Sequence, residues 1–95
     1  MADYELLYIS DPNLTDDKRQ TLEDRIQRHI ETGGGNIDSV DDWGVRRLAY
    51  PIKKLEEGRY KLVNFACESE YLNTLEKQLR LVQGMIRFIL VRKDK

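Results

Sequence analysis

The stretch that decides the fold covers residues 59–92 and reads RYKLVNFACESEYLNTLEKQLRLVQGMIRFILVR. Apolar and polar side chains alternate from Arg59 to Glu68, which predicts a strand. Apolar residues then recur at helical spacing from Leu72 to Val82, and Ser69 is the expected N-cap of this helix. Alternation returns from Met85 to Arg92, so the segment predicts strand, helix and strand in succession.

The first part of the chain predicts a similar unit followed by a hairpin. Tyr4 to Ser10 has the composition of a short strand, and a helix is expected from about Thr15 to Thr32. Gly33 is the expected left-handed cap at the end of this helix. A second strand is expected over roughly Asn36 to Leu48, and the turn Glu56-Glu57-Gly58 should lead into the third.

The order strand, helix, strand, strand, helix, strand is typical of one α+β architecture. It predicts a split βαβ (βαββαβ), ferredoxin-like fold, in which a four-stranded antiparallel sheet carries two helices on one face. At least three strands have apolar residues on both faces, so the uncovered sheet face should be partly apolar and should bind a partner. The length of 95 residues predicts a single domain over residues 1–95.

Composition excludes several classes of protein. With 35% charged and 40% hydrophobic residues the chain is globular, and no apolar run is long enough to span a bilayer. No signal segment opens the sequence, so a soluble, unexported protein with no membrane partner is expected. Cys67 and His29 are the single cysteine and histidine, which predicts no disulfide, metal site, cofactor or catalytic centre. Gly33-Gly34-Gly35 follows a helix, so it is not a phosphate loop.

Charge is divided unevenly along the chain although the net charge is only −1. Residues 1–42 hold four Lys/Arg and eleven Asp/Glu, a balance of −7, whereas residues 43–95 hold twelve and six, a balance of +6. The change falls at residues 43–54, which read WGVRRLAYPIKK. Two arginines on a strand and two lysines on the following loop suit phosphate, and Tyr50 offers a stacking face. This stretch therefore predicts a binding surface rather than an active site.

Two other functions are compatible with parts of the sequence. In the first, Gly58 to Phe65 partly matches the third strand of RNA-recognition motifs, and Tyr8 and Tyr60 would be exposed to stack on single-stranded RNA. In the second, Val82 to Arg87 resembles the anion loop of acylphosphatases. That loop opens the first helix of those enzymes, whereas here Gly84 is expected to end the second helix, so the match favours no enzyme and no small-molecule substrate.

The segment Gly44-Val45-Arg46-Arg47-Leu48-Ala49-Tyr50-Pro51-Ile52-Lys53 resembles the signature of a known family, bacterial small-subunit ribosomal protein six. The opening residues from Tyr4 to Leu14, the turn Gly58-Arg59-Tyr60 and the closing strand from Ile86 to Val91 resemble the same family. The resemblance extends over essentially the whole chain. It implies the ferredoxin-like fold, a location on the cytoplasmic ribosome and a structural role without catalysis.

The resemblance also implies partners and site residues. It implies a heterodimer with small-subunit ribosomal protein eighteen that binds ribosomal RNA of the central domain, the platform, and supports subunit assembly and translation. The residues expected to bind RNA or the partner are Arg46, Arg47, Tyr50, Lys53, Lys54, Arg87, Arg92 and Lys93, of which the last two are added from charge alone. Charged side chains at a sheet edge also oppose strand-to-strand aggregation, a role that stays open beside partner binding.

Two departures from the family limit what is carried over. Some members have basic residues just after the initiator methionine, whereas this chain has Ala2-Asp3. Some members extend into a C-terminal tail beyond the position of Lys95. We therefore expect neither an RNA contact at the N-terminus nor the functions of a tail.

Overall fold

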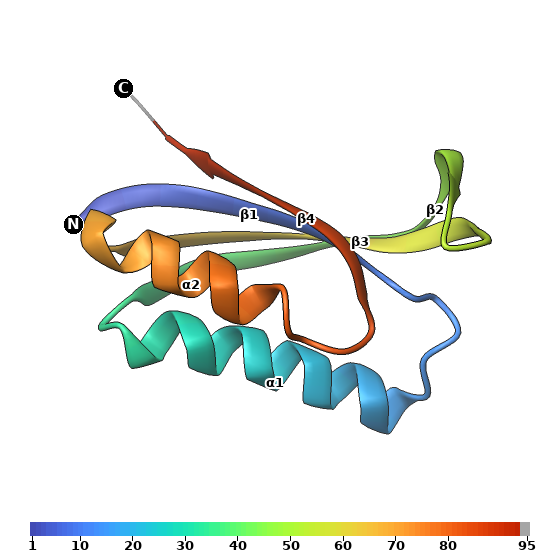
Figure 1. Ribbon diagram of the computed structural model, residues 1–95, viewed down its shortest axis with the longest axis horizontal. Helices are drawn as coiled ribbons and strands as arrows, with labels where there is room; N and C mark the ends of the chain where they lie inside the picture. Colours follow the sequence, from blue (N-terminus) through green and yellow to red (C-terminus); the bar gives the residue numbers. More distant parts are fainter. Residues whose placement is uncertain (94–95) are drawn as a thin grey trace.

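The computed structural model describes residues 1–93 of the chain and has the predicted element order (Figure 1). The elements are β1 (Ala2–Ser10), α1 (Asp16–Thr32), β2 (Asn36–Ile52), β3 (Leu55–Cys67), the 3-10 helix η1 (Ser69–Tyr71), α2 (Leu72–Leu79) and β4 (Met85–Arg92). The strands form one antiparallel sheet in the order β2-β3-β1-β4, and both helices lie on one face of it. The ferredoxin-like prediction is confirmed for this part of the chain.

The core lies between the sheet and the two helices. Alternate residues of β1 and β3 enter it, as the period of two requires, and apolar residues three and four apart enter it from the helices. The buried members are Tyr4, Leu6, Tyr8, Leu22, Ile26, Ile30, Val63, Phe65, Cys67, Leu75, Leu79 and Val82. The rings of Tyr4 and Phe65 stack with centroids 5.7 Å apart, which ties the two central strands together across the core face.

The hairpin between β2 and β3 is longer than predicted. β2 continues past Leu48 to Ile52, and Glu56-Glu57-Gly58, the predicted turn, lies within β3. The chain turns instead at Lys53 and Lys54, where both residues have positive φ angles, 51° and 67°. Pro51 does not end β2 because β2 is an edge strand of the sheet, where proline's missing N–H is tolerated.

Three further predicted boundaries were wrong. Gly33 has a φ of −86°, and the left-handed residue after α1 is Gly34, with a φ of 81°. Ser69 does not cap α2, because its hydroxyl lies toward Glu70 and the chain first forms η1. The helix α2 ends at Leu79, well before Gly84, so the predicted 3.6-residue spacing extended beyond the regular helix.

Gly44 lies at a bulge of β2. The β2–β3 register passes from Asp42 opposite Lys61 to Gly44 opposite Tyr60, which leaves Trp43 as the extra residue. Gly44 has a φ of 78°, and its N–H donates to the Asp42 carboxylate at 2.8 Å. The bulge therefore sets the direction of the tryptophan side chain.

Candidate protein and nucleic-acid interface

The face of the sheet away from α1 and α2, here called the open face, carries an apolar groove of about 320 Å³. Its walls come from all four strands, and the lining residues are Glu5, Leu7, Trp43, Leu62, Ile89 and Val91. Ile89 and Val91 are about half exposed and Trp43 is 40% exposed. The prediction of a partly apolar uncovered face is confirmed, and the exposed apolar side chains gathered in this groove make the open face a candidate binding site.

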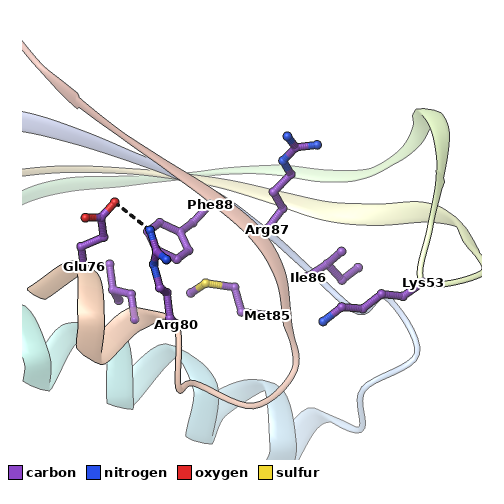
Figure 2. A pocket seen from close by; sticks show the side chains of 8 residues that line it. Lys53, Glu76, Arg80, Met85, Ile86, Arg87 and Phe88 are labelled. Carbon is purple, nitrogen blue, oxygen red and sulfur yellow. Dashed lines mark hydrogen bonds and ion pairs between the residues drawn. The ribbon is translucent and has the colours of Figure 1, made fainter.

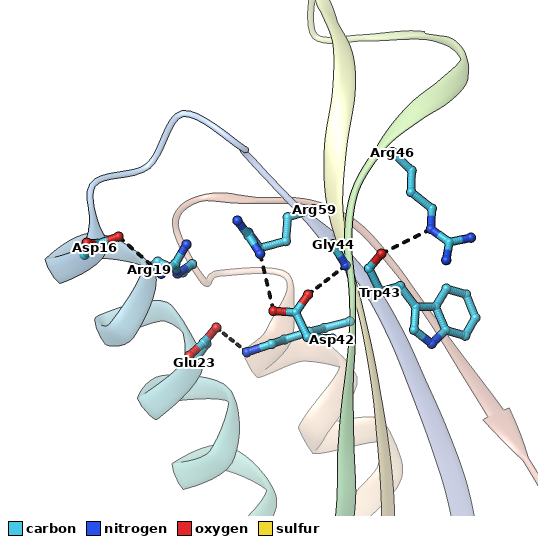
Figure 3. A network of polar contacts seen from close by, with 9 residues as sticks. Asp16, Arg19, Glu23, Asp42, Trp43, Gly44, Arg46 and Arg59 are labelled. Carbon is cyan, nitrogen blue, oxygen red and sulfur yellow. Dashed lines mark hydrogen bonds and ion pairs between the residues drawn. The ribbon is translucent and has the colours of Figure 1, made fainter.

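Arg46 is held against this groove by Trp43. Its guanidinium lies over the indole ring, 5.4 Å from the centroid, and its Nε donates to the Trp43 carbonyl at 3.2 Å (Figure 3). The cation–π contact and the hydrogen bond restrict a side chain that is otherwise mobile on a surface. Arg46 is thus a preoriented cation at the edge of an apolar groove.

Arg47 lies on the other face of the sheet. Consecutive residues of a strand point to opposite faces, so Arg46 and Arg47 cannot share one binding surface. In the register of the hairpin Arg46 is opposite Gly58 and Arg47 is opposite the exposed Glu57. The structure therefore separates two residues that the sequence placed together.

Tyr50 and Arg87 meet on the open face although they are far apart in the chain. The Arg87 guanidinium donates to the Tyr50 hydroxyl at 2.6 Å. The far end of the hairpin curls away from the helices (Figure 1), and the Tyr50–Arg87 hydrogen bond joins β2 to β4. Tyr50 is 56% exposed, so its ring remains accessible while its hydroxyl is held.

Lys53 and Lys54 form the turn of the hairpin, and Lys53 lines a second groove of about 350 Å³, here called the tip groove. Its other walls come from α2, the loop that follows it and β4, and Arg80 contributes a second cation, which is paired with the Glu76 carboxylate of the same groove at 3.4 Å (Figure 2). Arg87 starts from the same wall but points away from α2 (Figure 2). Cations from three separate segments therefore lie around the hairpin turn, an arrangement that suits a phosphate backbone.

The structure does not bring Arg92 and Lys93 to this cluster. Arg92 ends β4 opposite Tyr4, whereas Arg87 is opposite Ile9, so the two arginines lie about 16 Å apart along the strand. The backbone N–H of Lys93 donates to the Asp3 carbonyl at 2.9 Å. Any contact by these two residues belongs to the opposite end of the sheet.

Sequence reasoning missed several residues of both grooves. Arg80 was not singled out, because its place at the end of the second helix gave no sign that it would line the same groove as Lys53. Trp43, Leu62, Ile89 and Val91 lie on strands that are apolar on both faces, and that pattern was the available signal. Which residues faced the helices could be decided only by packing.

The core face holds polar contacts that serve stability. Asp42 accepts from Arg59 at 3.3 Å as well as from Gly44, and Lys61 of β3 pairs with Glu23 of α1 (Figure 3). The Lys61–Glu23 pair is partly buried and joins helix to sheet. It therefore fixes α1 in place rather than presenting a charge to a partner.

The exposed stacking aromatics required by the RNA-recognition-motif alternative are not both present. Tyr8 is 2% exposed and belongs to the core under α1. Burial, followed by the nearby Glu23 and Asp42 carboxylates, raises the pKa of the Tyr8 phenol. Tyr60 lies opposite Ile9 on the open face and is half-buried. Because the two tyrosines lie on opposite faces, they cannot stack on one RNA strand.

The single histidine and cysteine have structural surroundings. The backbone carbonyl of His29 accepts from the Tyr71 hydroxyl at 2.5 Å, which joins the end of α1 to η1. Cys67 is fully buried, and this burial, with Glu68 nearby, raises the pKa of its thiol. Within residues 1–93 no three His, Cys, Asp or Glu side chains gather as metal ligands, and no helix of this range is long and apolar enough to cross a membrane.

Comparison with known proteins gives one consistent result. The family model described as Ribosomal protein S6 matches residues 3–92. Curated relatives named small ribosomal subunit protein bS6, from Clostridium novyi and Alkaliphilus oremlandii, are 39% and 41% identical over 95 residues, covering 100% of this chain and of each relative. The crystal structure of 30S ribosomal protein S6 from Thermotoga maritima superposes with a TM-score of 0.89 at 35% identity, covering 97% of this chain and 87% of that chain.

Proposed function

The chain belongs to the ribosomal protein S6 family and is a non-enzymatic, structural protein of the small ribosomal subunit, and from this premise we propose how its two grooves divide the work. The open face binds small-subunit ribosomal protein eighteen. The hairpin turn and the tip groove bind ribosomal RNA of the central domain, the platform. The heterodimer so formed supports assembly of the subunit in the cytoplasm.

The observation that carries this proposal is the separation of apolar surface from cationic surface. The open-face groove is walled by apolar side chains of all four strands, as a protein interface core requires. The hairpin turn, by contrast, carries Lys53 and Lys54 and adjoins Arg80. Contacts with RNA phosphates depend on such cations. An apolar groove, by contrast, would contribute little affinity for the hydrated phosphate backbone of RNA.

Net charge supports a shared RNA site. A chain with a net charge of −1 releases few counterions from RNA, so its own affinity should be low at physiological salt. We therefore expect the isolated chain to bind central-domain RNA weakly, and added protein eighteen to tighten binding by at least about a hundredfold. Titrations at one fixed salt concentration measure both affinities. Equal affinity with and without protein eighteen would contradict the heterodimer.

Arg46 and Arg47 offer a second test, because they are neighbours in the chain and lie on opposite faces of the sheet. Replacing both by alanine should lower assembly more than it lowers folding stability. Arg46→Ala alone should weaken capture of protein eighteen about tenfold, because it removes the preoriented cation beside Trp43. Arg47→Ala is the matched control on the other face and should have a smaller effect.

Thermal melts and a partner pull-down separate binding from folding in these variants. Each single variant should unfold within about 0.5 kcal/mol of the parent, because both side chains are exposed. Loss of folding without a specific loss of partner binding would assign the arginines a structural role.

A further inference from the structure

Glu5 places one carboxylate inside the apolar groove of the open face. Its register partners are Asn64 on β3 and Val91 on β4, so it lies on a central strand rather than at the rim. The other groove walls are Leu7, Trp43, Leu62, Ile89 and Val91. Glu5 is already partly buried in the free chain.

Within residues 1–93 the carboxylate of Glu5 belongs to none of the ion pairs. Two of the cations that flank the open face are engaged elsewhere, since Arg46 contacts Trp43 and Arg87 contacts Tyr50, and Lys93 lies beyond the groove, beside Asp3. In the free chain an unpaired Glu5 carboxylate costs little free energy, because water still reaches it.

A partner that covers the groove would raise the free-energy cost of leaving the Glu5 carboxylate unpaired. A partner that seals the apolar walls removes water from Glu5, and an unpaired charge in such a place is costly unless an opposite charge accompanies the partner. A phosphate group would be repelled by this carboxylate, which disfavours an RNA backbone on this part of the open face, whereas the Glu76 carboxylate of the tip groove is paired with Arg80. A lysine or arginine side chain fits, because its aliphatic stem can lie along apolar walls while its head reaches the carboxylate.

We propose that Glu5 selects the protein partner of the open face by pairing with one lysine or arginine side chain that lies in the apolar groove. The stem of this side chain contacts Leu62, Ile89 and Val91, and its head donates to the Glu5 carboxylate. An arginine can donate two parallel hydrogen bonds there, which fixes the orientation of the partner as well as its affinity. This inference rests on the proposed function, since it names the chemistry by which a protein binds that face.

Trp43 supplies the readout, because it is the single tryptophan of the chain and lines the same groove. Protein eighteen, with any tryptophan of its own replaced by phenylalanine, is titrated into the chain while Trp43 emission is followed. Glu5→Gln keeps the shape of the side chain and removes its charge, and should weaken binding at least about tenfold. Glu5→Asp keeps the charge on a shorter stem and should recover part of that loss.

Glu68→Gln is the matched control, since Glu68 is exposed and follows β3 outside the groove. It should leave the affinity unchanged. The folding stability of the free Glu5→Gln variant should equal or exceed that of the parent, because the carboxylate makes no ion pair in the free chain. A loss of stability in Glu5→Gln that accounts for the weaker binding would overturn the proposal, since Glu5 would then be structural.

The outcomes also distinguish this proposal from the proposed function. If protein eighteen fails to bind the parent chain, the proposed function fails at its first step. If it binds the parent and Glu5→Gln equally, the partner stands and the pairing with Glu5 is wrong. If central-domain RNA alone shifts Trp43 emission and Glu5→Gln tightens that binding, the groove binds RNA and the proposal is overturned.

Discussion

Among single residues, Lys53 and Lys54 combine a strained backbone with the charges proposed to bind RNA. A two-residue hairpin turn with both φ angles positive favours asparagine and glycine, because a Cβ atom is crowded in that conformation. Lysine at both places costs about 1 kcal/mol at each, and the side chains contribute nothing to the core. Strain of this kind persists at binding sites, so the turn supports the proposed RNA contact.

Lys54→Gly should therefore stabilise the fold while weakening RNA binding by the heterodimer. Lys54→Ala is the matched control, because it removes the same charge and keeps the Cβ atom at a φ of 67°. We expect the glycine variant to be about 1 kcal/mol more stable than the alanine variant in urea unfolding. Both should lose a similar share of RNA affinity. Equal stability of the two variants would show that the turn is unstrained.

Among the elements, α1 and η1 are joined by a close approach that needs a glycine. A Cβ atom at Gly33 would lie 2.3 Å from the ring of Tyr71, although the backbone of Gly33 has an ordinary φ. The Tyr71 hydroxyl donates to His29 in the last turn of α1, and burial raises the pKa of this phenol. The end of α1 and the start of the second helical segment are therefore one packed unit.

Gly33→Ala should destabilise the protein by more than about 2 kcal/mol, because Tyr71 must move or its hydrogen bond must break. The same change in a Tyr71→Ala background should cost much less, since the ring is gone. A double-mutant cycle in urea measures this coupling. Additive effects of the two substitutions would mean that Gly33 is required for another reason.

For the whole molecule, buried acids make stability depend on pH at the alkaline end. The pKa of Cys67 is raised above its ordinary 9.0 and that of Tyr8 above its ordinary 10.0, in both cases chiefly by burial. The folded chain thus holds these protons more tightly than the unfolded chain does. Their contribution to stability is complete below pH 9 and is lost progressively as the pH rises through the folded pKa values.

Tyr8→Phe should flatten the loss of stability above pH 10, because it removes the phenol that titrates in the unfolded chain. The free energy of unfolding of the parent and of the variant is measured in urea from neutral to strongly alkaline pH, and the slope of each curve against pH is compared. We expect the parent and the variant to differ little in their slopes at neutral pH. Parallel curves above pH 10 would show that Tyr8 does not contribute to the alkaline transition.

Periodicity in the sequence determined the order of the elements and their types. Alternation from residue 85 to residue 92 located β4 at both ends, because strand side chains that pack on the core must recur every second residue. The turn of the hairpin was misplaced for an opposite reason. Glycine is a common turn residue, so Gly58 was interpreted as part of the turn. A glycine is needed at this position of β3 for another reason, because a Cβ atom would lie 2.3 Å from the Ile9 side chain.

The sequence alone also determined that a basic surface begins near Trp43 and that the uncovered sheet face is partly apolar. Only the tertiary structure decided which face each side chain occupies, because strands that are apolar on both sides carry no sign of where the helices lie. Because the helices pack on one face of the sheet, Tyr8 is buried, Arg46 and Arg47 differ in their surroundings, and Glu5 lies in the groove of the open face. Sequence spacing fixes which residues share a face, whereas packing against α1 and α2 decides which face remains for a partner.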